Sequence, residues 1–159
     1  LFAEAPAPAD VLALGEARLI ELIRPATFPE PKARDVLEIA RRIRDDHDGE
    51  VPATMEGLTA FRGVGPKVAA LTLAVAFGVP IVPVDVHVHR IANRWGLVAT
   101  RTPEQTMKAL EEALPRRYWI ATNELLVPFG KSVCTGVAPR CSTCLLLSMC
   151  RRVGVTSSR

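Results

Sequence analysis

The stretch Phe61–Ala69 reads FRGVGPKVA and decides how the chain is organised. It places a Gly-x-Gly turn before a helix with Pro66 at its first position, where proline is favoured. Glycine permits a left-handed backbone and the close approach of another molecule. Because backbone N–H groups beside a helix N-terminus suit a phosphate, the turn is predicted to bind a nucleic-acid backbone. Alone the pattern also fits a plain turn, and the candidate phosphate-binding residues are Gly63, Val64 and Gly65.

Lys67 follows this turn at the second position of the helix, where the positive end of the helix dipole disfavours a cation. The next residues, Val68 to Ala70, offer no carboxylate, and the helix they begin is expected to be buried. Both effects favour the uncharged amine. An uncharged lysine is a nucleophile suited to forming a Schiff base with a sugar or carbonyl carbon, so Lys67 is predicted to be catalytic.

Asp85 is the predicted N-cap of a helix over His87–Trp95. N-capping keeps a carboxylate ionised, and an ionised acid can deprotonate an amine or stabilise a sugar cation. We therefore predict that Asp85 is both a cap and a catalytic group. His87 and His89 stand two residues apart and do not share a helix face, which argues against a His-x-His metal site. We expect His87 to make structural hydrogen bonds and His89 to lie at the surface.

The only cysteines of the chain fall in one window with the spacing C-x₆-C-x₂-C-x₅-C. Such crowding favours one metal centre. Zinc ribbons usually pair two C-x₂-C knuckles, and only one is present here, so the spacing favours a [4Fe–4S] cluster over structural zinc. Two disulfides are the alternative for a secreted chain, although Leu1–Pro8 does not resemble a signal peptide. The candidate ligands are Cys134, Cys141, Cys144 and Cys150.

The remaining pattern is helical nearly throughout. Apolar spacing and capping signals predict helices over about 10–24 (with Asp10 as the cap), 31–47, 54–61, 66–77, 87–95, 102–114 and 116–131. Two prolines within Pro80–Val84 favour an extended crossing segment over a strand. We therefore predict an all-α fold of two helical lobes with a cleft between them, residues 1–79 and residues 80–159. The apolar helix Pro66–Phe77 is expected to be the buried axis of its lobe.

A formal charge of +3 is only weakly basic and does not by itself establish a nucleic-acid partner. Local cations must supply that attraction. The longest apolar stretch, Val68–Val79, is too short to span a bilayer, so no membrane partner is expected. The candidate basic residues are Arg62, Lys67, Arg90, Arg94, Lys131, Arg140, Arg151 and Arg152.

Together, three motifs resemble those of the endonuclease III family, the iron–sulfur branch of the helix-hairpin-helix DNA glycosylases. They are GVGPK at 63–67, VDVHVHRIANR at 84–94 and the cysteine window. The resemblance runs from about Leu1 to Cys150 and strengthens the prediction of a [4Fe–4S] cluster. It implies base excision DNA repair, in which a bifunctional enzyme removes oxidised pyrimidines and nicks the abasic strand by β-elimination.

Carried onto this sequence, the resemblance implies that Lys67 attacks C1′ of a flipped nucleotide, while Asp85 abstracts a proton or stabilises charge. Phe28 aligns with a residue that wedges into the duplex, with ordinary core packing as the alternative. The implied partner is double-stranded DNA with a damaged or abasic nucleotide, and the protein is expected to bind it as a monomer. The implied location is intracellular: the cytoplasm or nucleoid of a bacterium, or the nucleus or mitochondrion of a eukaryote. Besides the turn, the implied DNA contacts are Phe28, Arg90, Lys131 and Arg140.

The sequence also departs from the family pattern. Arg62 stands where proline is usual, and Val86 stands where threonine is usual. The N-terminal helices that carry part of the lesion pocket have no counterpart, so we expect an incomplete first lobe, exposed apolar faces on 66–77, and lyase chemistry that survives better than base selection. Two alternatives remain: a monofunctional mismatch or alkylation glycosylase, against which Lys67 argues, and a non-catalytic or lyase-only DNA-binding module with a structural metal.

Overall fold

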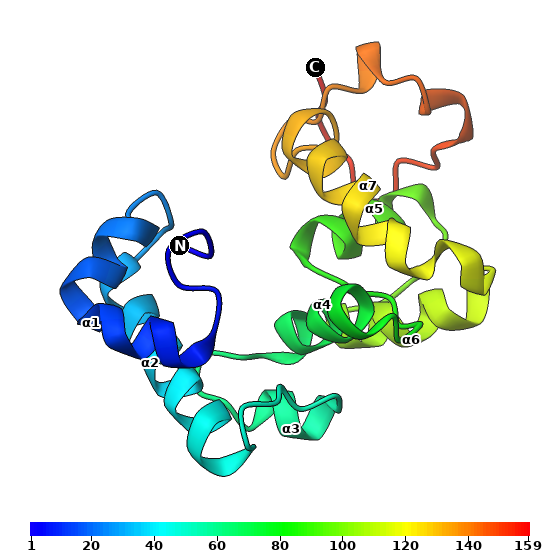
Figure 1. Cartoon of the computed structure of the whole chain (residues 1–159). Helices are drawn as coiled ribbons and strands as arrows, with labels where there is room; N and C mark the ends of the chain where they lie inside the picture. Colours follow the sequence, from blue (N-terminus) through cyan, green and yellow to red (C-terminus); the bar gives the residue numbers. More distant parts are fainter. The chain divides into compact units, whose positions relative to one another are not determined.

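The computed structural model describes all 159 residues, and it contains helices and no strands. The predicted all-α fold is confirmed. Contacts divide the chain into two compact units, Leu1–Gly65 and Pro66–Arg159 (Figure 1). This boundary lies before the predicted division at residues 79 and 80, because the helix after Gly65 groups with the segments that follow it. No helix combines the length and the apolar character needed to cross a membrane.

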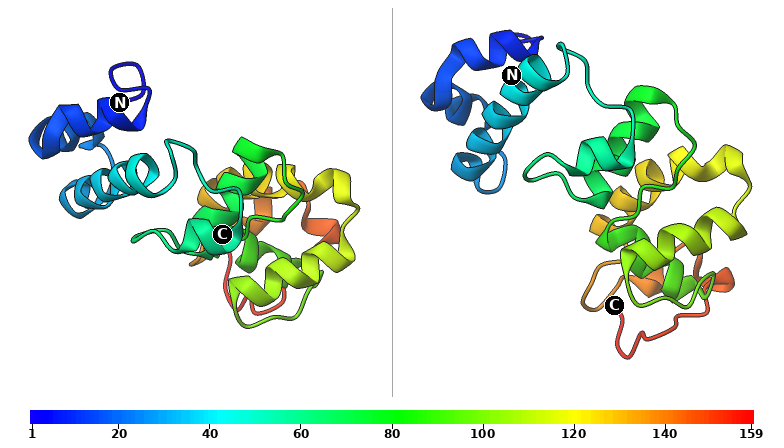
Figure 2. Two further views of the ribbon diagram at one scale, coloured as in Figure 1. Left: turned by 60° about the horizontal axis from the view of Figure 1, so that its bottom comes forward. Right: turned by 90° about the horizontal axis from the view of Figure 1, so that it is seen from below.

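The first unit is a pair of helices that lie side by side, followed by a short third helix (Figure 2). A glycine with φ of 72° interrupts the first helix at Gly15. Asp10 is not the N-cap, because the helix begins earlier and the Asp10 carboxylate accepts a hydrogen bond from the Ala7 N–H at 3.1 Å. The helices of this unit are α1 (Pro8–Ile23), α2 (Pro29–Asp46) and α3 (Met55–Thr59).

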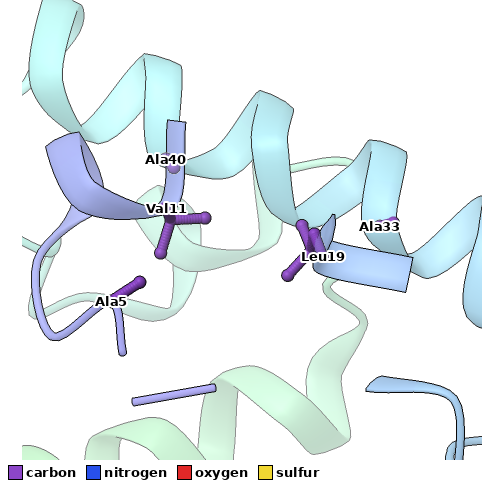
Figure 3. Close-up of a cluster of buried hydrophobic side chains, with 5 residues drawn as sticks. All are labelled: Ala5, Val11, Leu19, Ala33 and Ala40. Atoms are coloured by element: carbon purple, nitrogen blue, oxygen red, sulfur yellow. The ribbon is translucent and has the colours of Figure 1, made fainter. Parts of the chain in front are cut away.

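A small apolar core holds α1 against α2 (Figure 3). Ala5, Val11 and Leu19 come from the first segment, and Ala33 and Ala40 come from one face of α2. The alanines are seven residues apart, which places them on the same side of the helix, and their small side chains allow the two helices to approach closely. The paired helices therefore depend on close packing as much as on buried area.

In the second unit α5 packs against both α6 and α7. Close approach of α5 and α7 requires Gly130, because a Cβ there would lie 2.7 Å from Cβ of His87. The core cluster consists of Val82, Val84, Val88, Ala92 and Leu110. The elements of this unit are α4 (Pro66–Phe77), α5 (Val86–Trp95), α6 (Pro103–Ala113), η1 (Arg116–Tyr118), α7 (Trp119–Ser132), η2 (Cys141–Thr143) and η3 (Leu147–Met149).

The segment Pro80–Val84 is extended and forms no strand, as its prolines predicted. Side chains from α6 and α7 supply hydrogen bonds that a neighbouring strand would otherwise make. Glu111 Oε1 accepts from the Val82 N–H at 3.2 Å, and Asn123 Nδ2 donates to the Pro83 carbonyl at 3.1 Å. The segment is therefore part of the core of the second unit, whereas we had expected a bridge between lobes.

The helix α4 is buried on one face only. Its buried residues are small or aliphatic, whereas Val75 is 71% exposed and Val68 and Phe77 are also exposed. The prediction that α4 is the buried axis of its lobe is wrong. The helix is apolar on all sides, but other residues pack against only one of them. The alternative expectation, that apolar faces of this helix would be exposed, is met.

Candidate active site

Asp85 occupies the N-cap position of α5 with an extended backbone. Its Oδ1 accepts hydrogen bonds from the N–H groups of His87 at 2.8 Å and Val88 at 2.9 Å. These contacts satisfy two N–H groups of the first turn that have no partner within the helix. The side chain is 5% exposed, so the predicted cap is confirmed and the carboxylate is held in one orientation.

Lys67 lies beside this carboxylate in the same unit, with Nζ 3.5 Å from Oδ2 of Asp85. The structure thus brings together the two residues predicted to be catalytic. Its side chain is 49% exposed, so the desolvation expected from the sequence is only partial. Its sequence neighbours Val68 to Ala70 supply no carboxylate, as the sequence indicated, and the one beside it comes from Asp85. A carboxylate oxygen with no cap bond can accept a proton from the amine, and the exposed side of the amine can be reached by an electrophile.

The two histidines of α5 have structural partners. His87 Nδ1 lies 3.0 Å from Nη2 of Arg90, as expected for a structural role. His89 Nδ1 lies 2.6 Å from the hydroxyl of Thr106, whose side chain is fully buried, so the expectation of a surface position is wrong. Helix packing brings α6 onto His89, which the local sequence does not reveal.

The Gly-x-Gly turn belongs to the first unit. Gly63 has a φ of 79°, and a Cβ there would lie 2.8 Å from Oδ2 of Asp35. The Val64 N–H closes the turn by donating to the Phe61 carbonyl at 3.2 Å, so this predicted phosphate donor is already engaged. Gly65 has open space where a Cβ would be, which leaves its backbone accessible to a ligand.

Phe28 stands just before α2 in a left-handed conformation, with φ of 55° and ψ of 66°. Its side chain is 74% exposed, so the alternative of ordinary core packing is wrong. A bulky residue rarely adopts positive φ, and such strain is typical of functional loops. The residue predicted to be a wedge is therefore presented to solvent.

All four cysteines are free thiols that line a single small cavity. The disulfide alternative is not formed. No group of three or more His, Cys, Asp or Glu side chains converges closely enough to hold one metal ion. Trp95 and Phe129 close one side of the cavity, with ring centroids 6.2 Å apart. The structure therefore gathers four sulfur donors around a volume with an apolar wall.

Two arginines one helical turn apart on α5 hold the start of the cysteine loop. Arg94 Nη1 donates to Sγ of Cys134 at 3.5 Å and to the Thr135 carbonyl at 2.6 Å, and its Nη2 donates to the Gly136 carbonyl at 2.8 Å. Arg90 donates to the Cys134 carbonyl through Nε at 3.1 Å and to the Gly130 carbonyl through Nη2 at 2.9 Å.

These contacts make Arg90 and Arg94 positioning residues for the loop, and they give no support to the predicted DNA contact of Arg90. From the sequence, Arg94 is only one of eight candidate basic residues. The sequence signal for this role is the i,i+4 spacing of the two arginines on the helix that Asp85 caps. By contrast, Lys131 and Arg140 are exposed, and Arg140 lines the cysteine cavity.

Sequence comparison matches residues 1–116 to the family described as HhH-GPD superfamily base excision DNA repair protein. Endonuclease III-like protein 1 of Bos taurus is 43% identical over 143 residues, which are 88% of this chain and 47% of the bovine protein. Endonuclease III of Bacillus subtilis (strain 168) is 35% identical over 152 residues, which are 95% of this chain and 69% of that protein. The chain thus spans about half the length of its bovine relative.

Solved structures agree with the sequence comparison. A trapped covalent intermediate of endonuclease III with DNA superposes with a TM-score of 0.83 at 32% identity, covering 95% of this chain and 71% of that one. A thermostable thymine-DNA glycosylase shares the fold, with a TM-score of 0.78 at 22% identity over 94% of this chain and 70% of that one. The chain therefore belongs to the HhH-GPD superfamily of base excision DNA repair proteins and, within it, to the endonuclease III family.

Proposed function

We propose that this chain is a bifunctional DNA glycosylase of base excision repair, which removes oxidised pyrimidines and cleaves abasic sites by β-elimination. One observation carries the proposal: Nζ of Lys67 lies 3.5 Å from Oδ2 of Asp85. An amine beside a fixed acid is the arrangement that Schiff-base chemistry requires. Membership of the endonuclease III family and likeness to a trapped endonuclease III–DNA covalent intermediate support the same reaction class.

In the proposed reaction Asp85 Oδ2 accepts a proton from Lys67, and the Nζ lone pair attacks C1′ of the damaged nucleotide. The bond between C1′ and the base breaks, and the base leaves with the bonding electrons. The nitrogen loses its second proton and forms a Schiff base with C1′ as the C1′–O4′ bond breaks and O4′ takes up a proton, which opens the sugar ring. Loss of a proton from C2′ and cleavage of the C3′–O bond complete the β-elimination, and water releases Lys67. The cap bonds to Oδ1 of Asp85 keep Oδ2 aimed at the amine throughout.

We propose double-stranded DNA with a damaged or abasic nucleotide as the partner, bound by a monomer. Its target base must leave the stack before chemistry can reach C1′. The exposed Phe28 suits a wedge that unstacks the duplex, and the accessible backbone at Gly65 suits a phosphate. Lys131 and Arg140 are exposed cations that can add phosphate contacts.

A [4Fe–4S] cluster is the proposed occupant of the cysteine cavity. Cys134, Cys141, Cys144 and Cys150 would hold the cluster, because their sulfurs line one cavity and a cluster site does not require them to converge on a single ion. The N–H donors at Cys134 and Cys150, from Arg94 and the Arg152 backbone, suit thiolate ligands. When bound, the cluster supplies a covalent brace for the loop. Free thiols suit a reducing intracellular compartment.

The test is borohydride trapping on a duplex with one abasic site. Wild-type protein is expected to form a covalent adduct, and Lys67→Gln is expected to form none. Lys108→Gln is the matched control, because it removes an exposed lysine on α6. A wild-type protein that forms no adduct, or an adduct undiminished in Lys67→Gln, would overturn the proposal.

A lyase-only protein is the second candidate, because the Lys67–Asp85 pair can supply the lyase chemistry by itself, whereas excision also needs a pocket for the damaged base. Excision of an oxidised pyrimidine and nicking of an abasic site should be measured side by side. Nicking without excision would favour the lyase-only protein. Comparable rates for both would favour the bifunctional enzyme.

A further inference from the structure

A carboxylate lies directly against the Gly-x-Gly turn in the first unit. Asp35, on α2, places Oδ2 only 2.8 Å from the position that a Cβ of Gly63 would take. The same side chain binds Nε of Arg62 through Oδ1 at 3.1 Å. Asp35 is 24% exposed and Arg62 is 82% exposed, so the acid is largely covered and the guanidinium faces solvent.

A bare carboxylate at this position would oppose phosphate binding, because like charges repel most where water is partly excluded. Arg62 removes that obstacle by pairing with Asp35. The recorded contact uses Nε, and a guanidinium carries four further N–H donors on its two terminal nitrogens. Those donors match the geometry of a phosphodiester, which arginine binds in a bidentate manner.

We propose that Arg62 is a phosphate-binding residue of the turn and that Asp35 is a positioning residue which holds the guanidinium beside Gly63. The inference rests on the proposed function, since it takes the phosphodiester of DNA as the ligand of the turn. Arg62 then acts twice: it neutralises the acid next to the turn, and it donates to the phosphate. Gly63 is required at this point because its positive φ and the adjacent carboxylate exclude a side chain.

An exposed ion pair usually contributes little to folding stability. The alternative to phosphate binding is therefore that Arg62 and Asp35 form a surface ion pair with no role in DNA binding. The Arg44–Asp45 pair of the same unit serves as the comparison. It is another exposed pair of an arginine and an aspartate, and both of its residues lie on α2. If Arg62 binds phosphate, its removal must change DNA affinity and the salt dependence of that affinity, whereas removal of Arg44 must change neither.

The experiment measures the Kd for a duplex with a stable abasic-site analogue over a series of salt concentrations, using the full chain. Arg62→Ala is expected to weaken binding about tenfold. It should also reduce the slope of log K against log salt concentration by about 0.9, the value for one lost phosphate contact. Arg62→Lys keeps the charge and should keep the slope, and Arg44→Ala should match the wild type. A Kd within twofold of wild type and an unchanged slope for Arg62→Ala would overturn the proposal.

The role of Asp35 is tested by a double-mutant cycle. In the Asp35→Asn background there is no negative charge beside the turn for Arg62 to neutralise. Arg62→Ala then removes only the phosphate contact and should weaken binding only about threefold. An equal loss in both backgrounds would overturn the role of Asp35. Circular dichroism of each variant checks folding.

Failure of the proposed function looks different. A wild-type protein that neither binds the duplex nor forms the Lys67 adduct would contradict that function. A wild-type protein that does both, with Arg62→Ala indistinguishable from it in Kd and salt slope, would contradict only the inference about the turn.

Discussion

Asp85 presents only one of its two carboxylate oxygens to Lys67. Oδ2 lies 3.5 Å from Nζ, while Oδ1 is held by two backbone N–H groups of the first turn of α5. The acid is covered and fixed, and the amine is half exposed on a flexible stem. The position of the carboxylate therefore sets the geometry of the pair, and the lysine adjusts to it.

Because Oδ1 of Asp85 makes the cap bonds and Oδ2 faces Lys67, we predict that mutation can separate helix capping from the proposed reaction. Asp85→Asn keeps an oxygen for the cap, so the free energy of unfolding should change little, whereas the rate of abasic-site nicking should fall about a hundredfold or more. Asp85→Ala should lose about 1 kcal/mol of stability as well. Urea unfolding and a nicking assay measure the two effects. Thr102→Ala, which removes the cap of α6, is the control that should lose stability alone. Wild-type nicking by Asp85→Asn would contradict this assignment.

Arg94 is predicted to protect the cysteine loop. Arg94→Gln removes the donor to Sγ of Cys134 and the donors to two loop carbonyls. Because partners of metal ligands typically account for 10- to 100-fold in metal affinity, the variant should lose iron to a chelator about tenfold faster. Iron content and visible absorbance provide readouts that do not depend on activity. Arg101→Gln, at an exposed arginine, should retain iron like the wild type. Equal retention by Arg94→Gln would show that the contact is dispensable.

Gly130 is predicted to resist substitution. Alanine normally gains about 1 kcal/mol over glycine in a helix, but overpacking costs about 1–3 kcal/mol. A Cβ at Gly130 would lie 2.7 Å from both Cβ and Nδ1 of His87, and Cβ of His87 cannot move without its backbone. Gly130→Ala should therefore unfold at lower urea. Gly136→Ala, whose Cβ meets nothing closer than 4.0 Å, should be near neutral, and equal midpoints for the two variants would count against the close packing.

Acid should weaken the first unit through Glu4. Arg18 donates two hydrogen bonds to its carboxylate and lowers the pKa of Glu4 below the ordinary value of 4.5. Because the folded pKa is the lower one, this contribution to stability is present above pH 4.5 and is lost as the pH falls through the folded pKa. An NMR titration should show the Glu4 midpoint rising in Arg18→Met. An unchanged midpoint would rule out the pairing in solution.

Local signals explain the parts of the fold that the sequence predicted well. Asp85 and Gly96 bound α5, and Thr102 caps α6 as expected, because capping depends on residues within one turn. The prediction for Asp10 is wrong for the same reason: its carboxylate does take part in the cap, but it lies inside the helix and binds the N–H of the N-cap residue Ala7. The break at Gly15 was missed, since an isolated glycine is usually tolerated in a helix.

The sequence predicted which residues form the candidate site, but not how exposed they are or which distant residues they contact. The pairing of Lys67 with Asp85 followed from what an amine and an acid can do together. The half exposure of Lys67 and the engagement of Arg90 with the Cys134 carbonyl, 44 residues away, depend on how α5 meets other segments. No periodicity or cap encodes such distant contacts. The same holds for Asp35, which reaches the Gly63 turn from α2.

Under the proposed function Asp85 is both a helix cap and a catalytic group, and this double role restricts how the protein can change over generations. Replacements at position 85 that cannot cap a helix would damage folding as well as the proposed reaction, whereas asparagine, which keeps the shape and one oxygen of the side chain, would remove the reaction from an otherwise intact molecule. Among duplicated copies that persist without enzymatic activity, Asn at this position is the substitution that we expect to find.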